Sequence, residues 1–176
     1  VDIESPDADP GLPPAEITKE RGRASGPFLQ AWAQGGLVLS RGEGICQHGG
    51  RIYLVDTEAG RDSAGTPGRG DGAIWEYDPE AGTLRAIFVA GSQQVGDNID
   101  NITASPRGGL LLCENGEGVV DEYGQGTRLI GITPDGDSFA FARNNVDLSF
   151  TDLLALGKRV EPDWYCTAEF AGACFD

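Results

Sequence analysis

A repeated hairpin pattern is the feature that most restricts how this chain can fold. Residues 42–60 read GEGICQHGGRIYLVDTEAG, and residues 97–118 read DNIDNITASPRGGLLLCENGEG. In both stretches a carboxylate opens one short strand, a turn ends in two glycines, and a second carboxylate closes the next strand. The turns align at Gly49-Gly50 and Gly108-Gly109, an offset of 59 residues (108 − 49). A third stretch of this kind, EFAGACFD, begins at residue 169. This recurrence predicts repeat units that bury their apolar faces against one another.

Each unit is expected to hold four strands, because short apolar runs alternate with turn residues. DPEAG at 78–82 and PDGD at 134–137 are strong turn sequences at matching places in the two units. We therefore predict an all-β fold of β-propeller blades: about two four-stranded blades and the start of a third. The predicted strands are 43–47, 51–56, 73–77 and 83–89 in the first blade (43–89), and 99–104, 110–114, 128–133 and 138–143 in the second (99–143).

The rest of the chain flanks or interrupts these blades. Residues 1–36 are rich in Pro, Asp, Glu and Gly and are expected to form an irregular lead-in, with one helical turn near 15–21. A partial propeller domain follows at 37–176, in which the apolar run Leu37–Leu39 begins the strands. An insertion at 145–168 precedes the next blade at 169–176. It should contain a short helix that is capped by Asp147 or Ser149, stopped by Gly157, and apolar on the face of Phe150, Leu153 and Leu154.

The charge balance restricts the partners. The chain has 13 Lys and Arg against 28 Asp and Glu, a net charge of −15, which argues against nucleic acid or an anionic membrane as a partner. No run is long and apolar enough for a membrane span. The charge fits a protein that is kept soluble by an acidic surface, or one that binds divalent cations. The absence of Met suggests a processed or truncated piece.

Four cysteines do not make a disulfide scaffold in a chain of this length. The sequence contains no C-x-x-C pair, which excludes a zinc ribbon. Cys46, Cys113 and Cys174 lie in apolar strand contexts and are expected to be small buried hydrophobic residues. A Cys166–Cys174 bridge is one alternative, and a thiol ligand to a metal is another.

Carboxylates at the starts of the inner strands point to a metal site. In a propeller the innermost strand of each blade faces the central channel, and here these strands begin with Glu43, Asp100 and Glu169. Three carboxylates that converge on one axis repel one another unless a cation lies among them. Glu114, at the end of a strand, is a further candidate ligand. The alternative for each residue is a turn carboxylate in solvent.

Two further side chains could act on a substrate. Asn101 could offer its amide carbonyl to a metal or its amide N–H to a substrate, and Arg143 could hold two oxygens of a phosphate. His48 is the only histidine, and it lies in a hairpin turn. No His-based catalytic triad or zincin-type zinc site can therefore form elsewhere in the chain, and His48 itself is not expected to be catalytic.

Taken together, EGICQHGGRIYLVDT, IWEYDPEAGTLRAIF, DNIDNITASPRGGLLLCENG, RLIGITPDG, FARN and EFAGACF resemble the PhoX-type alkaline phosphatases. The resemblance covers residues 43–176. It implies a six-bladed propeller, export to the periplasm or outside by the twin-arginine route, and hydrolysis of phosphate monoesters. It also implies a channel cluster of several Ca²⁺ ions, with Fe³⁺ as a possible further ion. On the matching motifs, Glu43, Asp100, Glu114 and Glu169 take the metal-ligand roles.

Other functions remain open from the sequence. A gluconolactonase-like propeller would hold a single metal with one Glu, two Asn and one Asp, and Asn101 and Asn144 could serve there. A non-catalytic propeller for binding or assembly is the third possibility. Because two blades cannot close a ring, we expect the remaining blades to come from the rest of a longer chain or from another subunit. This piece alone could therefore be inactive.

Overall fold

The computed structural model of the chain describes residues 26–157, 159 and 163–175, in which β-strands are the main regular structure and helices are few. They belong to two units, one up to residue 39 and one from residue 40 onward. The helical turn predicted near 15–21 lies outside the described residues. No helix in the described part of the chain is long and apolar enough to cross a membrane.

The first unit contains helix α2 (Gly26–Ala33), inside the segment that the sequence predicted to be irregular. Pro27 stands in its first turn, where its fixed φ favours a helix start and its missing N–H costs nothing. The helix ends where Gly36 N–H donates to the carbonyl of Ala31 at 2.8 Å, past Gly35 at φ +77°. The run Leu37–Leu39, predicted to begin the strands, is not a strand.

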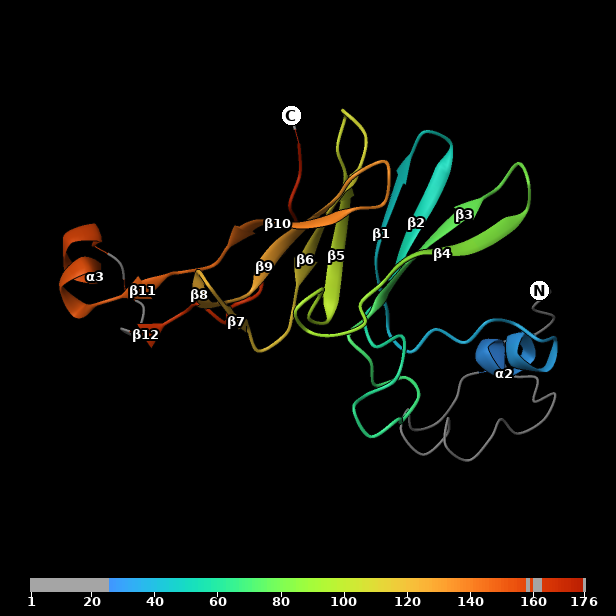
Figure 1. Cartoon of the computed structure of the whole chain (residues 1–176), viewed down its shortest axis with the longest axis horizontal. Coiled ribbons are helices and arrows are strands. Elements are labelled where there is room, and N and C mark those ends of the chain that lie inside the picture. The colour runs from blue at the N-terminus through green and yellow to red at the C-terminus, as the bar shows by residue number, and fades with distance from the viewer. Residues whose placement is uncertain (1–25, 158, 160–162, 176) are drawn as a thin grey trace. The chain divides into compact units, whose positions relative to one another are not determined.

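The second unit contains two four-stranded antiparallel sheets, which we call blade 1 and blade 2 (Figure 1). Blade 1 consists of β1 (Gly42–His48), β2 (Arg51–Asp56), β3 (Ala73–Asp78) and β4 (Thr83–Val89), and blade 2 consists of β5 (Ile99–Ala104), β6 (Leu110–Glu114), β9 (Arg128–Ile132) and β10 (Ser138–Arg143). Neighbours in the sequence are neighbours in each sheet. The predicted all-β class and the eight blade strands are confirmed, with ends that agree within one residue.

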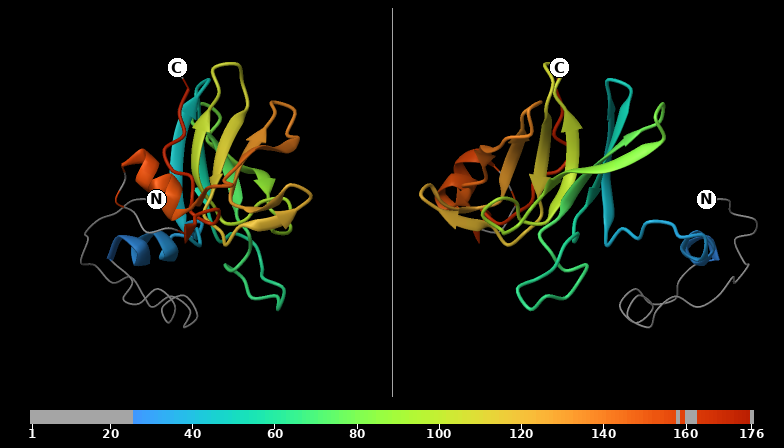
Figure 2. Two further views of the ribbon diagram at one scale, coloured as in Figure 1. Left: turned by 90° about the vertical axis from the view of Figure 1, so that its left-hand side faces the viewer. Right: turned by 45° about the vertical axis from the view of Figure 1, so that its right-hand side comes forward.

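The repeated glycines are explained by the turns. Gly49 (φ +56°), Gly50 (φ +78°), Gly108 (φ +87°) and Gly109 (φ +80°) all adopt left-handed backbone conformations that residues with a Cβ disfavour. They close the β1–β2 and β5–β6 hairpins at the same end of the two blades, as Figure 2 shows. A hairpin that the sequence did not predict, β7 (Val119–Asp121) and β8 (Gly124–Gly126), lies between β6 and β9.

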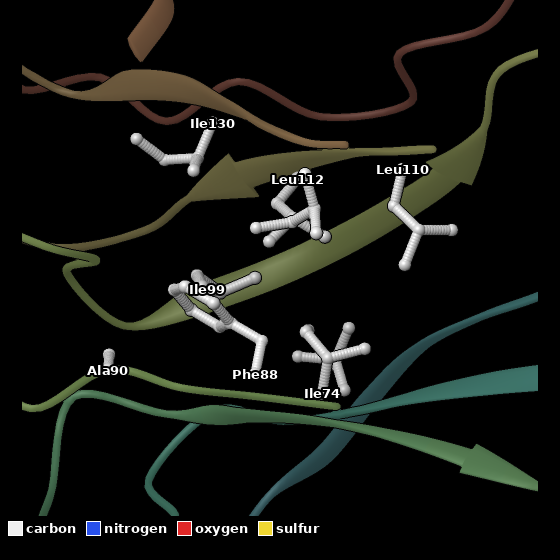
Figure 3. Close-up of a cluster of buried hydrophobic side chains, with 9 residues drawn as sticks. Ile74, Phe88, Ala90, Ile99, Leu110, Leu112 and Ile130 are labelled. Carbon is white, nitrogen blue, oxygen red and sulfur yellow. The ribbon is translucent and has the colours of Figure 1, made fainter. Parts of the chain in front are cut away.

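The core lies between the blades. Blade 1 contributes Val55, Ile74 and Phe88, and blade 2 contributes a larger aliphatic group: Ile99, Leu110, Leu112, Ile130 and Ile132. Figure 3 shows Ile74 and Phe88 of blade 1 facing Leu110 and Leu112 of blade 2. The inner strands β1 and β5 lie side by side (Figure 1). A Cβ on Gly44 would lie 2.8 Å from the carbonyl oxygen of Asp100, so only glycine allows this close approach.

The insertion after blade 2 is partly as predicted. Its helix α3 (Phe150–Leu156) is capped by Ser149 rather than Asp147, with a capping box to Asp152, and it ends at Gly157 in the left-handed conformation. Strands β11 (Asp147–Leu148) and β12 (Asp163–Trp164) close the insertion. The expected apolar face is only partly buried, because Leu153 is buried whereas Phe150 and Leu154 are each 65% exposed.

Two expectations for the last residues are corrected by the structure. Residues 169–175 are described and form no strand. Cys174 is exposed rather than buried, while Cys46 is half-buried and Cys113 and Cys166 are buried. All four thiols are free, so the Cys166–Cys174 bridge is not formed.

Candidate active site

The close approach of β1 and β5 brings Glu43 and Asp100 together near the starts of the two inner strands. Burial, followed by the negative charge of Glu43, raises the pKa of Asp100. The negative charge of Glu43 therefore acts on Asp100, and the role of the two carboxylates as metal ligands stays a prediction.

The two oxygens of Asp100 have different surroundings. Oδ2 accepts a hydrogen bond from Nδ2 of Asn115 at 3.0 Å. Oδ1 is buried and has no hydrogen-bond partner among the described residues. A buried carboxylate oxygen without a donor is costly, and a cation or an ordered water would remove that cost. The hard oxygen donors of Asp100 and Glu43 are the type that Ca²⁺ prefers, so these residues fit the predicted ion.

Arg41 is the cation nearest to this pair, and the sequence analysis did not single it out. Its Nη2 donates to Oε1 of Glu43 at 3.0 Å, and its Nη1 lies 3.5 Å from Oε1 of Glu58. The hydrogen bond with Glu43 is the main cause that raises the pKa of Arg41. The signal was its position two residues before Glu43, on the segment that leads into β1.

Glu169 is exposed and lies in the segment that follows the insertion. Burial raises the pKa of Cys113, and the charges of Asp100 and Glu169 act in the same direction, while a hydrogen bond from the backbone of Ala173 opposes them. Both carboxylates therefore lie within electrostatic reach of one thiol. In the described part of the chain, however, no three His, Cys, Asp or Glu side chains gather closely enough to hold a metal ion.

Glu114 has a different environment. It is 0% exposed, and both of its oxygens are engaged by Arg128, which is 4% exposed: Nη2 to Oε1 at 2.6 Å and Nε to Oε2 at 3.0 Å. Two backbone N–H groups complete the set, from Asp97 at 3.0 Å and from Arg128 at 2.7 Å. In this structure Glu114 holds the end of β6 in place.

Asp56 at the end of β2 supports this interpretation of Glu114. It occupies the matching place in blade 1, opposite Gly42 as Glu114 is opposite Ile99. It is also buried and accepts backbone N–H groups, from Ser40 at 2.8 Å and from Arg41 at 2.9 Å. A buried acid at the end of the second strand is therefore a feature that both blades share.

The two predicted substrate-binding residues differ in location. Asn101 directly follows Asp100 on β5, is partly buried and pairs with Cys113 on β6. Arg143 lies at the end of β10, the edge strand opposite β5, so the structure does not bring it to the carboxylates. It forms an ion pair with Asp121 and donates to the carbonyl oxygens of Val119 at 3.1 Å and Gly124 at 2.5 Å. These bonds hold the β7–β8 hairpin.

A cavity of about 510 Å³ lies at the other end of the blades, beside the glycine turns. Its lining includes His48, Tyr53, Glu76 and Arg85. Glu76 and Arg85 form an ion pair at 2.8 Å, and Tyr53 also hydrogen-bonds Glu76, so these polar groups satisfy one another. None of the predicted site residues lines this cavity, and the chemistry of the carboxylate site gives it no role.

Comparison with known proteins agrees with the family resemblance of the sequence motifs. The family model described as Alkaline phosphatase PhoX matches residues 1–176. No curated protein and no solved structure matches the chain. Because the family model covers the chain from end to end, the chain belongs to the PhoX family of alkaline phosphatases.

Proposed function

We propose that the protein hydrolyses phosphate monoesters in a calcium-dependent reaction at the starts of the inner strands. Asp100 and Glu43, with Glu169 from the following segment, are the proposed calcium ligands, and Fe³⁺ is a further candidate ion. The observation that carries this proposal is the buried Oδ1 of Asp100, which has no donor among the described residues and lies beside the charge of Glu43. Membership of the family supports the alkaline-phosphatase type of activity.

The protein's own residues would bind the ion and orient the substrate. When bound, Ca²⁺ supplies positive charge that neutralises the phosphate oxygens and the charge that develops on them. Arg41 is the proposed phosphate-binding arginine, because it already pairs with Glu43 and presents the planar donors that phosphate prefers. Asn101 stays a candidate for a substrate contact because it directly follows Asp100.

Glu114 and Arg143 are weaker candidates. To bind an ion, Glu114 would have to give up bonds to Arg128 and to two backbone N–H groups. Arg143 lies on β10, the edge strand opposite β5 and away from the proposed site, whereas Arg41, although it pairs with Glu43 and Glu58, lies at that site. We therefore rank both below Glu43, Asp100, Glu169 and Arg41. The proposal also includes export to the periplasm or outside, and completion of the ring by blades beyond these two.

A lactonase-like site is the second candidate, favoured by the presence of Asn101 beside Asp100. Its second amide, Asn144, has other partners, because its Nδ2 donates to the carbonyls of Tyr165 at 2.8 Å and Ala168 at 2.9 Å. Its Oδ1 accepts the N–H of Val146 at 3.1 Å. These bonds make the phosphatase the better supported of the two. A non-catalytic propeller would bind no stoichiometric metal.

Elemental analysis of protein purified without a chelator tests the proposal, together with hydrolysis of 4-nitrophenyl phosphate before and after EGTA. Stoichiometric calcium and an activity that EGTA abolishes are expected. Iron found in the protein together with calcium would support a mixed cluster. Asp100→Asn should lose both, whereas Asp135→Asn, in an exposed turn at the other end of the blades, is the matched control. Calcium with lactone hydrolysis alone would favour the lactonase, and absence of metal and of both activities would refute catalysis by this chain.

A further inference from the structure

The two oxygens of Asp100 are made unequal by one neighbouring amide. Asn115 donates from Nδ2 to Oδ2 at 3.0 Å, which leaves the buried Oδ1 as the oxygen that lacks a partner among the described residues. A carboxylate with one oxygen fixed in this way cannot rotate freely, so its other oxygen has a defined direction.

The backbone of Asn115 is held on both sides. It follows Glu114, which the buried bonds to Arg128 keep in place. Its own N–H donates to the carbonyl oxygen of Asn98 at 3.0 Å. The amide side chain therefore starts from a fixed point, and the position of its Nδ2 is set by the strand end rather than by the side chain alone.

Asn98 also restrains Asp100, which accepts the hydrogen bond from Asn115, because Asn98 lies two residues before it at the start of β5. It has a positive φ of +50°, and it is the only residue other than glycine with positive φ in the described part of the chain. Its N–H donates to the carbonyl of Asp71 at 3.2 Å, and its Nδ2 donates to the carbonyl of Thr57 at 3.3 Å. Both acceptors belong to the β2–β3 loop of blade 1, so Asn98 ties the start of β5 to the neighbouring blade.

Blade 1 shows that this arrangement is not a general property of the repeat. Thr57 follows Asp56 as Asn115 follows Glu114, and its N–H donates to the carbonyl of Arg41 at 2.9 Å in the same way. Its side chain, however, is too short to act as Asn115 does, and its buried hydroxyl has no partner among the described residues. Glu43 is held instead by Arg41. The backbone link recurs, but the amide contact to the carboxylate is found in blade 2.

From these contacts we infer that Asn115 is a positioning residue for Asp100: it holds Oδ2 and directs Oδ1 toward the bound cation. The inference rests on the proposed calcium-dependent function and adds a residue to it. Partners of this type, which hold a metal ligand by hydrogen bonds, typically change metal affinity by 10–100-fold when they are removed.

Calcium affinity of the full chain, measured by isothermal titration calorimetry, tests this inference independently of activity. Asn115→Leu has nearly the same size and no donor, and we expect its calcium Kd to rise about tenfold. Asn115→Gln retains the amide and should return the Kd to within about threefold of wild type. Asn145→Leu, which changes an exposed amide in the insertion, is the matched control and should leave the Kd unchanged.

The outcomes separate this inference from the proposed function. Calcium binding by the wild type with unchanged Kd in Asn115→Leu would overturn the positioning role and leave the proposed function intact. No calcium binding by the wild type would overturn both. If Asn115→Leu does not fold, as judged by circular dichroism without calcium, Asn115→Ser takes its place. Its hydroxyl is too short to reach Oδ2, and the same loss of affinity is expected, whereas wild-type affinity would contradict the inference.

Discussion

Removing Arg128 should destabilise the protein strongly, because Arg128 is the counter-charge of a fully buried carboxylate. Arg128→Met keeps much of the volume of the side chain but leaves Glu114, 0% exposed, without its cation. It also removes the donors that reach the backbone carbonyls of Gln94 at 3.0 Å and Gln93 at 2.7 Å. Breaking a buried ion pair from one side costs about 3–5 kcal/mol. Folded domains are stable by only about 5–15 kcal/mol, so the effect should be large.

Urea unfolding followed by tryptophan fluorescence gives the free energy of unfolding for each variant. The midpoint should fall in Arg128→Met while the m-value stays constant, because the same surface is exposed on unfolding. Glu114→Gln removes the charge but retains an oxygen for the N–H of Asp97. The double variant Glu114→Gln/Arg128→Met should therefore be more stable than Arg128→Met by at least about 1 kcal/mol.

The matched control is the ion pair between Arg85, whose side chain is 70% exposed, and Glu76, whose side chain is 13% exposed. Arg85→Met should lower the unfolding midpoint much less than Arg128→Met, because the arginine lies in solvent and Glu76 keeps its hydrogen bond with Tyr53. A loss below about 1 kcal/mol in Arg128→Met, or a double variant that equals the sum of its single variants, would refute the reasoning. Calcium titration of Glu114→Gln completes the test: unchanged affinity supports a structural role, whereas complete loss in a folded variant would make Glu114 a ligand.

Three further predictions follow from other contacts. Gly44→Ala should lower stability by about 1–3 kcal/mol, measured by urea unfolding, because its Cβ would meet the backbone of β5; a neutral effect would contradict the tight approach of β1 and β5. Ser149→Ala should weaken α3 by about 1 kcal/mol, detected as faster hydrogen exchange at 150–156, and unchanged exchange would mean that the capping box is not stabilising. Because burial and Glu43 raise the pKa of Asp100 in the folded state, its stabilising contribution without calcium is present below its unfolded pKa and is lost as pH rises through the folded pKa. Asp100→Asn should therefore gain stability over wild type as pH rises from about 4 to 7, measured by thermal unfolding with EGTA, and a constant difference would exclude the shift.

The blades were predictable because their signals are local. Apolar alternation and glycine turns fix a strand and its neighbour within a few residues of each other, and the same pattern occurs twice. The same repeat predicted that Glu43 and Asp100 lie near each other on the inner strands, and the charge of Glu43 does act on Asp100; their role as metal ligands stays a prediction. Helix α2 was missed because it spans only Gly26–Ala33 and its Gly-Pro start resembles a loop. The β7–β8 hairpin was missed because its strands have three residues each, too few to show a period.

The partners of individual charges could not be predicted in the same way. Glu114 and Arg128 are 14 residues apart with the unpredicted hairpin between them, so nothing in the sequence indicated that they meet. Without that arginine, a glutamate at a strand end looked like a metal ligand. Arg143 looked like a phosphate-binding arginine for a related reason: its partner Asp121 lies on the same missed hairpin. Long-range ion pairs depend on the connection between strands, which the pattern of the strands does not contain.

In each blade, a buried acid at the end of the second strand (Asp56 or Glu114) holds the segment that leads into the first strand. Asp56 receives the N–H groups of Ser40 and Arg41, and Glu114 receives that of Asp97, so each acid fastens the segment that leads into the same blade. These acid-to-backbone contacts therefore use residues of one blade and its own lead-in segment. A duplicated copy of such a unit would keep the contacts that hold its own lead-in segment, so its remaining residues could change without loss of those contacts.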